Sequence, residues 1–160
     1  MNSMKLLYLN WKNIENMCQQ LAKKIGKYNP HVLIGISRGG LVPVRILSDI
    51  LENANVGIMR VELYREIGRA AAAPKITQAI TADVKGKRVL LVDDVSDSGK
   101  SLAAAKKYLK DLGAEEIKIA TLHYKPKSLI KPDWFVKETD SWIVYPWEIN
   151  EVKREREDKR

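Results

Sequence analysis

The sequence predicts an α/β fold, in which a mainly parallel, twisted β-sheet is flanked by helices. Three observations lead to this prediction. Short apolar runs of strand length alternate with longer segments of helical periodicity along the 160 residues. Two polar loops each follow such a run and precede a helical segment. No internal repeat, low-complexity segment or linker divides the chain. Alternation of this kind is typical of parallel sheets whose strands are joined by crossover helices.

The first half of the chain sets up this alternation. Apolar residues at helical spacing predict a helix over residues 11–25. Residues 31–36 form a short apolar run and are predicted as a buried strand. A glycine-rich loop at 37–40 and a helix over 41–51 follow. A second strand is predicted over 56–63.

Residues 64–75 interrupt the periodicity, and we expect them to form a mobile excursion. A third strand over 87–92 ends in two aspartates, and Ser98 is predicted to cap a helix from 99 to 112. A fourth strand over 117–122 follows the helix, and Gly113 is predicted to end that helix. Short strands are expected over 134–147.

One domain over residues 1–150 is predicted, with a charged, frayed tail over 151–160. Apolar residues make up 45% of the chain and charged residues 30%, which is typical of a globular protein. The apolar runs are too short to span a membrane, and Cys18 is the single cysteine, so neither a disulfide framework nor a cysteine zinc cluster is expected. We expect no signal peptide and a cytoplasmic location. The net charge of +8 fits a solvated surface, an anionic substrate or nucleic acid, and does not separate them.

The segment 89–101 carries the most specific chemistry. Asp93 and Asp94 end a strand, where ligands of parallel sheets bind. The loop and helix start that follow offer hydroxyls and free backbone N–H groups to a phosphate. The two acids suit ribose hydroxyls, or Mg²⁺ held through water. Together the two ends of the loop suit a ribose 5-phosphate. The residues predicted to hold the 5-phosphate are Asp97, Ser98, Gly99, Lys100 and Ser101.

This segment resembles the signature with which phosphoribosyltransferases bind 5-phosphoribosyl-1-pyrophosphate (PRPP). The segment contains, in order, an apolar strand, two acids, two further residues, Asp, a hydroxyl residue, Gly, one residue and another hydroxyl residue. The resemblance implies the type I phosphoribosyltransferase fold with a small hood and a requirement for Mg²⁺. It also implies that Asp93 and Asp94 bind the ribose and the metal. Asp97 would lie near N7 of a purine and handle the proton of the base as the catalytic residue.

A second loop, Ser37-Arg38-Gly39-Gly40, resembles the pyrophosphate loop of the same family. Its glycines allow close backbone approach to an anion, and Arg38 supplies a charged fork. The resemblance implies pyrophosphate binding by Ser37, Arg38 and Gly39, with a cis peptide bond between Ser37 and Arg38. It also places Arg65 at the pyrophosphate, within a flexible hood over 64–75 that would exclude water.

The C-terminal part resembles bacterial xanthine–guanine phosphoribosyltransferases and their short archaeal relatives. The resemblance is carried by Lys125-Pro126 and by the run from Ser141 to Glu148. It implies that Lys125, Trp142 and Ile143 bind a 6-oxopurine: guanine, hypoxanthine or xanthine. It further implies a homo-oligomer, either a dimer or a tetramer. The activity expected is transfer of the phosphoribosyl group to the base in purine salvage, with PRPP and a purine as partners.

Other readings of the same residues remain as alternatives. Gly99-Lys100-Ser101 resembles the end of a P-loop, but Asp94 stands where that motif requires glycine. Gly35-x-Ser37-x-Gly39 matches a hydrolase nucleophile pattern, with Asp93 and His123 following in the order of a triad. Asp93 and Asp94 also resemble the acidic site of a response regulator. Within the phosphoribosyltransferase fold, the alternatives are an adenine-specific enzyme and a nucleic-acid-binding regulator. Nucleic-acid binding is not expected, because no basic stripe is interleaved with aromatics.

Overall fold

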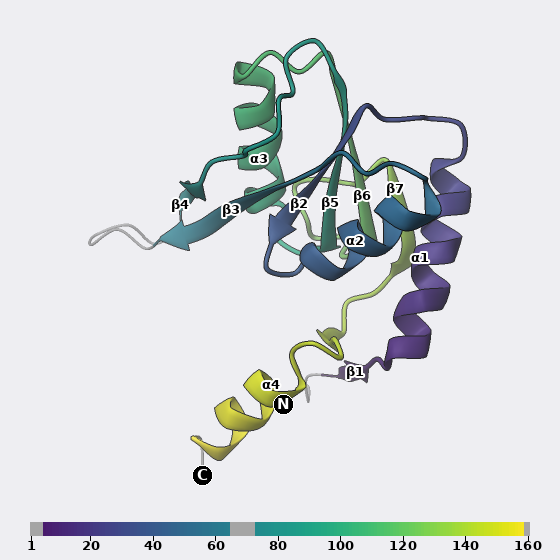
Figure 1. Ribbon diagram of the computed structural model, residues 1–160. Coiled ribbons are helices and arrows are strands. Elements are labelled where there is room, and N and C mark those ends of the chain that lie inside the picture. Colours follow the sequence, from purple (N-terminus) through teal and green to yellow (C-terminus); the bar gives the residue numbers. More distant parts are fainter. Residues whose placement is uncertain (1–4, 65–72, 159–160) are drawn as a thin grey trace.

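A six-stranded, mostly parallel sheet forms the centre of the protein in a computed structural model that describes residues 5–64 and 73–158 (Figure 1). The strand order is β4-β3-β2-β5-β6-β7, and only β3 and β4 pair in antiparallel fashion. The strands are β2 (Val32–Ser37), β3 (Val56–Tyr64), β4 (Ala73–Gln78), β5 (Arg88–Ser96), β6 (Glu116–Tyr124) and β7 (Trp134–Glu138). The α/β fold class is therefore confirmed.

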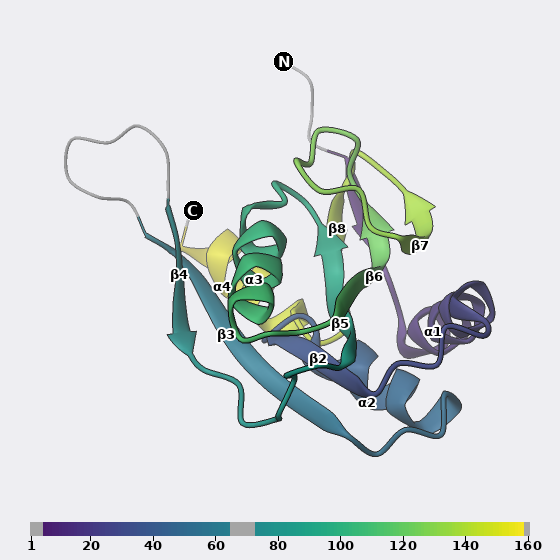
Figure 2. The same ribbon diagram turned by 90° about the horizontal axis from the view of Figure 1, so that it is seen from above.

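Helices cover both faces of this sheet (Figure 2). The helices α1 (Trp11–Ile25) and α2 (Leu41–Ile50) pack on one face, and α3 (Lys100–Asp111) packs on the other. Alternate residues of β2 point to the two faces: Leu33 packs with the core under α1 and α2, whereas Val32 and Ile34 pack with the core under α3. A strand buried on both faces reads as a continuous apolar run, which is why 31–36 is predicted as a strand.

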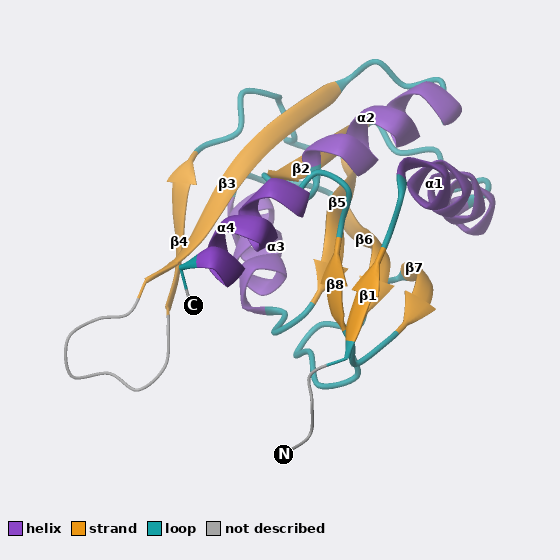
Figure 3. Cartoon of the chain, turned by 90° about the horizontal axis from the view of Figure 1, so that it is seen from below, coloured by secondary structure: helices purple, strands orange, loops and turns teal. Residues whose placement is uncertain are grey.

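A second, two-stranded sheet lies beyond the carboxyl ends of β2, β5 and β6 (Figures 1 and 3). In this sheet β1 (Leu6–Tyr8) pairs in parallel with β8 (Trp142–Val144), so the first and the last strand of the chain's described part lie side by side. The last helix, α4 (Ile149–Glu157), follows β8. This sheet and helix cover the edge of the central sheet where ligands are expected. Within the described ranges, no helix is long and apolar enough to cross a membrane.

The predicted helices and the strands β2, β3, β5 and β6 are found to within a few residues of the predicted bounds, with one correction at α3. Gly99, rather than Ser98, is the N-cap residue, and no side chain caps this helix. The hydroxyl of Ser98 accepts only a long hydrogen bond, 3.3 Å, from the Lys100 N–H. Of the predicted excursion, Tyr64 ends β3 and Lys75 lies in β4, while its centre falls outside the described residues.

Three elements were not predicted from the sequence: β1, β4 and α4. Residues 151–157, for which a frayed tail is expected, lie in α4. The division into one domain and a tail stays a prediction.

Candidate active site

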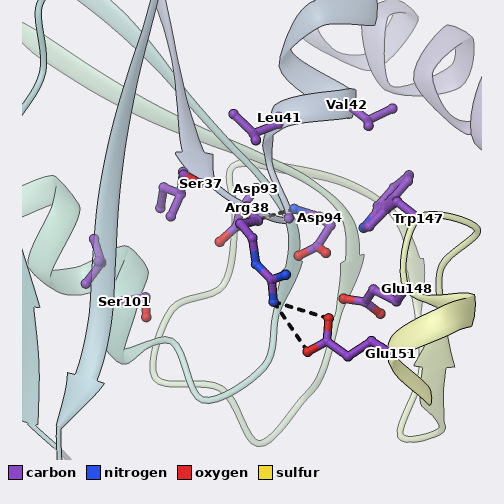
Figure 4. Close-up of a pocket in the computed structure, with 13 residues that line it drawn as sticks. Ser37, Arg38, Leu41, Val42, Asp93, Asp94, Ser101, Trp147, Glu148 and Glu151 are labelled. Carbon is purple, nitrogen blue, oxygen red and sulfur yellow. Dashed lines mark hydrogen bonds and ion pairs between the residues drawn. The ribbon is translucent and has the colours of Figure 1, made fainter. Parts of the chain in front are cut away.

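The loop after β2 and the carboxyl-terminal part of β5 meet in one cleft of about 450 Å³ (Figure 4). Ser37, at the end of β2, and Arg38 and Gly39, in the loop after it, line one side, and Asp93 and Asp94 of β5 line the other. The two segments touch: a Cβ atom added to Gly39 would collide with the Asp94 carboxylate. Glycine is therefore required at position 39 for this approach. The peptide bond between Ser37 and Arg38 is cis, as the resemblance implies.

The two aspartates are held by backbone hydrogen bonds at the end of β5. The Asp94 N–H donates to Asp93 Oδ1 at 2.9 Å, and the Val95 N–H donates to Asp94 Oδ1 at 2.7 Å. Burial raises the pKa of Asp94 to about 6, and burial followed by repulsion from Asp94 raises that of Asp93. Burial and the nearby Asp94 also raise the pKa of Glu148, to about 7. This pocket therefore concentrates carboxylates and favours a bound cation.

The C-terminal helix closes the outer side of this cleft. Arg38 extends across it, and its Nη2 donates to both carboxylate oxygens of Glu151 in α4, at 3.2 and 3.3 Å (Figure 4). Trp147 and Glu148 line the same cleft. Arg38 is thus engaged by the protein's own carboxylate at the position where a pyrophosphate is expected.

A second cleft lies over the start of α3. Asp97, Ser98, Gly99 and Ser101 line it together with Lys127. Gly99 adopts a positive φ of 80°, and a Cβ there would collide with the backbone N–H groups of residues 129 and 130. The N-terminus of α3 borders this cleft, where backbone N–H groups and the helix dipole suit a phosphate, and Lys127 adds a positive charge.

A third cleft has the polar and aromatic lining of a base-binding site. Lys125, Trp142 and Ile143 line it with Asp94 and Asp97. The Lys125 side chain is 7% exposed; its Nζ lies 3.4 Å from Asp97 Oδ2 and 5.8 Å from the Trp142 ring centroid. Trp142 is 46% exposed, so part of its side chain is accessible to a ligand. All three clefts share Asp94, which therefore lies where they meet.

The chemistry of these residues fits Mg²⁺ held mainly by ligands other than protein. Within the described part of the chain, no group of three or more His, Cys, Asp and Glu side chains could hold a metal ion. Asp93 and Asp94 offer hard carboxylate oxygens next to space for a substrate. Magnesium is usually bound by one or two carboxylates together with water and substrate phosphates. These two aspartates therefore suit Mg²⁺ in the presence of an anionic substrate.

Comparison with known proteins identifies the family. Residues 7–153 match the phosphoribosyl transferase domain family. The chain belongs to the phosphoribosyltransferase family. A purine phosphoribosyltransferase from Pyrococcus horikoshii is 44% identical, and its crystal structure superposes with a TM-score of 0.83 over 90% of this chain and 94% of that one. The predicted fold and enzyme class are therefore confirmed.

Curated relatives extend this likeness over nearly the whole chain. The hypoxanthine-guanine phosphoribosyltransferase of Saccharomyces cerevisiae is 28% identical, with 91% of this chain and 86% of the relative covered. The xanthine-guanine phosphoribosyltransferase of Cereibacter sphaeroides is 29% identical, with 91% and 88% covered. The hypoxanthine–guanine and xanthine–guanine branch that the sequence resembles is thus where similar proteins are found.

The predicted site residues of this phosphoribosyltransferase line the three clefts with two exceptions. Lys100 lines a separate pocket beside β4 and α3, and Arg65 lies outside the described residues. The hydrolase alternative finds no support, because the His123 ring bonds to Tyr145 and its Nε2 has no hydrogen-bond partner. The structure adds four residues that sequence reasoning did not assign: Lys127, Trp147, Glu148 and Glu151. Trp147 and Glu148 belong to the run that resembles the xanthine–guanine enzymes, so a signal was present. Lys127 and Glu151 carry no sequence signal of their own.

Proposed function

We propose that this phosphoribosyltransferase transfers the 5-phosphoribosyl group of PRPP to a 6-oxopurine, giving a nucleoside 5′-monophosphate and pyrophosphate in purine salvage. The observation that carries the proposal is the meeting of three clefts at Asp94. Their linings suit a pyrophosphate, a phosphate and a flat base, which are the parts that surround the reacting ribose. Purines appear in the names of the similar enzymes from Pyrococcus horikoshii and Saccharomyces cerevisiae.

The proposed reaction forms a bond from a purine ring nitrogen to the anomeric carbon and breaks the bond from that carbon to pyrophosphate. Ser37, Arg38 and Gly39 hold the pyrophosphate, and Arg65 is proposed to join them. Asp97 accepts the proton that the base nitrogen loses, or stabilises the tautomer that attacks. Lys125 and Lys127 lie 3.4 and 3.1 Å from the Asp97 carboxylate and hold it in place.

Two adjacent segments bind different parts of PRPP. Asp93 and Asp94 face the ribose hydroxyls, and residues 97–101 bind the 5-phosphate at the start of α3. Asp93 and Asp94 would hold Mg²⁺, which would supply the positive charge that neutralises the pyrophosphate. Without that neutralisation the acidic pair would repel the substrate.

The choice of base is assigned to Lys125, Trp142 and Ile143. An ammonium group has three donors and no acceptor, so Lys125 can satisfy the 6-oxo group but not the 6-amino group of adenine. Trp142 offers a ring face for stacking. The main-chain carbonyl of Ile143 can accept from a 2-amino group, which favours guanine.

Two alternatives define the test. An adenine-specific enzyme would leave Lys125 facing a donor, and a nucleic-acid-binding regulator of the same fold would not need the base cleft. The deciding experiment incubates the protein with PRPP, Mg²⁺ and each free base, and measures pyrophosphate release. Guanine, hypoxanthine or xanthine should react faster than adenine. No turnover with any base, together with salt-dependent nucleic-acid binding, would favour the regulator.

Assembly and location belong to the same proposal. We expect a dimer or tetramer, which light scattering after gel filtration would measure, and a cytoplasmic location.

A further inference from the structure

A chain of hydrogen bonds runs beneath the two aspartates and uses residues that have no role in the proposed reaction. His123 in β6 is fully buried, and Tyr145, which follows β8, is 2% exposed. The His123 Nδ1 atom lies 2.9 Å from the Tyr145 hydroxyl. That hydroxyl donates to the main-chain carbonyl of Asp94 at 3.1 Å.

The direction of these bonds follows from counting protons. The Tyr145 hydroxyl has one hydrogen, which it gives to the Asp94 carbonyl, so His123 Nδ1 must carry a proton and donate to the hydroxyl oxygen. His123 Nε2 is then the acceptor nitrogen, and it has no hydrogen-bond partner. Burial, with further contributions from Lys137 in β7 and from Lys125 just after β6, lowers the pKa of His123 to about 4, so the ring is neutral at pH 7.

Aromatic contacts hold the tyrosine ring in place. The rings of Tyr145 and Trp147 stack with centroids 4.7 Å apart and planes 5° apart. The His123 ring meets Tyr145 edge-on, with centroids 5.6 Å apart. A ring packed in this way has little rotational freedom, so its hydroxyl stays fixed at the Asp94 carbonyl.

The Asp94 carbonyl, which accepts from the Tyr145 hydroxyl, lies beyond the part of β5 that is hydrogen-bonded to β2. Pairing of β2 with β5 ends at Gly35 and Val92, two residues before Asp94. The Asp94 carbonyl and the Val95 N–H belong to one planar peptide unit, and this N–H donates to Asp94 Oδ1. A bond that fixes the carbonyl therefore also fixes the donor that orients the Asp94 carboxylate.

The same chain of bonds connects this carboxylate to the base cleft. His123, in β6, precedes Lys125 by two residues. Tyr145, directly after β8, follows Ile143 of that strand by two residues. Both base-binding segments are therefore tied to the peptide of Asp94 through one hydroxyl.

We propose that His123 and Tyr145 are positioning residues for phosphoribosyl transfer. They hold the Asp94 peptide, so that the Asp94 carboxylate and the base bound at Lys125 are both correctly placed relative to the ribose. This inference rests on the proposed function, in which Asp94 binds the ribose of PRPP. His123 lines none of the three clefts, and Tyr145 borders the base cleft while its hydroxyl bonds to the Asp94 carbonyl; the proposed role of both residues runs through Asp94.

The test uses variants that remove or keep a single donor. Tyr145→Phe removes the hydroxyl and keeps the stacked ring. His123→Leu removes the donor to Tyr145, whereas His123→Asn keeps an amide nitrogen in the place of Nδ1. For each variant, kcat and KM for PRPP and for guanine are measured at a temperature where circular dichroism shows the protein to be folded.

Tyr145→Phe and His123→Leu should lower kcat/KM for PRPP about ten-fold, equivalent to about 1.4 kcal/mol, while KM for guanine changes less. His123→Asn should remain close to wild type. Adding His123→Leu to Tyr145→Phe should cost little more than either change alone, because both break the same chain of bonds.

Wild-type kcat and KM values in Tyr145→Phe would overturn the inference, as would equal effects of His123→Asn and His123→Leu. Loss of melting temperature without a change in kcat or KM would also overturn it, because a purely structural role predicts that result. Failure of the proposed function is a separate outcome: in that case the wild-type protein itself does not turn over PRPP with any purine.

Discussion

Asp97 is the residue whose chemistry can be separated most directly from its structural role. Its carboxylate lies between Lys125 and Lys127, at 3.4 and 3.1 Å, and it stands in the loop that binds the 5-phosphate. Asp97→Asn keeps the shape of the loop but removes the proton acceptor. We expect the rate of the chemical step to fall by about 10²- to 10⁴-fold, while binding of PRPP weakens far less. Single-turnover kinetics and PRPP titration measure the two effects. Equal losses in both would assign Asp97 to shaping the loop.

Lys125 should control discrimination between oxo and amino purines. In Lys125→Ala the donor at position 6 is lost, and the preference for guanine over adenine, measured as a ratio of kcat/KM values, should fall about ten-fold. Lys127→Ala is the matched control, since Lys127 also pairs with Asp97 but does not line the base cleft. The control should leave the ratio unchanged. A ratio unaffected in Lys125→Ala would remove this lysine from base selection.

His123 should make the folded state sensitive to mild acid. Its pKa falls from an ordinary 6.5 to about 4 on folding, so between these values the unfolded chain binds a proton that the folded chain does not. Stability is therefore lost as the pH falls from 6.5 toward 4, by about 2 to 3 kcal/mol from this group. Asp93, Asp94 and Glu148, whose pKa values are raised, act in the opposite direction.

Comparison of the wild type with His123→Asn isolates the contribution of the histidine, because the carboxylates are common to both proteins. Urea unfolding at pH 7 and at pH 4.5 should show a larger loss of unfolding free energy in the wild type. Equal losses would indicate that the histidine is protonated in the folded protein.

Residues of the site differ in how far the sequence could predict them. Asp93, Asp97 and Gly99 stand in a contiguous signature between a strand and a helix, so their proximity follows from local structure. Lys127 and Glu151 reach the site from a loop and a helix far along the chain. Their positions depend on tertiary packing, and no spacing in the sequence encodes it.

The same distinction applies to whole elements. The buried strands and α1 have strong apolar patterns, and the N-terminus of α1 is closed by a capping box between Asn10 and Asn13. The three residues of β1 pair with β8, which lies more than a hundred positions later in the chain. A local sequence pattern cannot predict such a pairing. The edge strand β4 is half exposed and contains Pro74, and α4 has no buried residue. Without a buried face these two elements leave no hydrophobic periodicity.

Helix α4 also supplies a testable competitor for the pyrophosphate. Arg38 must leave Glu151 before it can bind an anion, so Glu151→Gln should lower KM for PRPP. The side chains are exposed, and pairs of this kind contribute less than about 1 kcal/mol, so we expect a two- to three-fold effect. Glu155→Gln removes the same charge from an exposed position of the same helix and should have a smaller effect. Equal KM values for the two variants would assign the change to net charge alone.

At the scale of the whole molecule, charge is distributed unevenly with respect to the substrate. The chain carries a net charge of +8, yet carboxylates gather where the clefts meet: Asp93, Asp94 and Glu148. Basic side chains stand around them, with Arg38, Lys125 and Lys127 each beside one cleft. A positive surface attracts an anion over a distance of about one Debye length, roughly 8 Å at physiological salt. In the site itself, however, the negatively charged pyrophosphate of PRPP lies next to the carboxylates Asp93, Asp94 and Glu148.

This arrangement predicts an absolute requirement for a divalent cation. Product formation should stop in excess EDTA and return with excess Mg²⁺, because the pyrophosphate of PRPP must be neutralised beside Asp93 and Asp94. Asp93→Asn and Asp94→Asn should each reduce turnover by roughly ten-fold or more while the protein stays folded, since a hydrogen-bonded charge is lost from the ribose and metal site. A rise in the Mg²⁺ concentration needed for half-maximal rate would distinguish loss of metal binding from loss of a ribose contact. Full activity of either variant, or of the wild type in EDTA, would exclude these aspartates from the site.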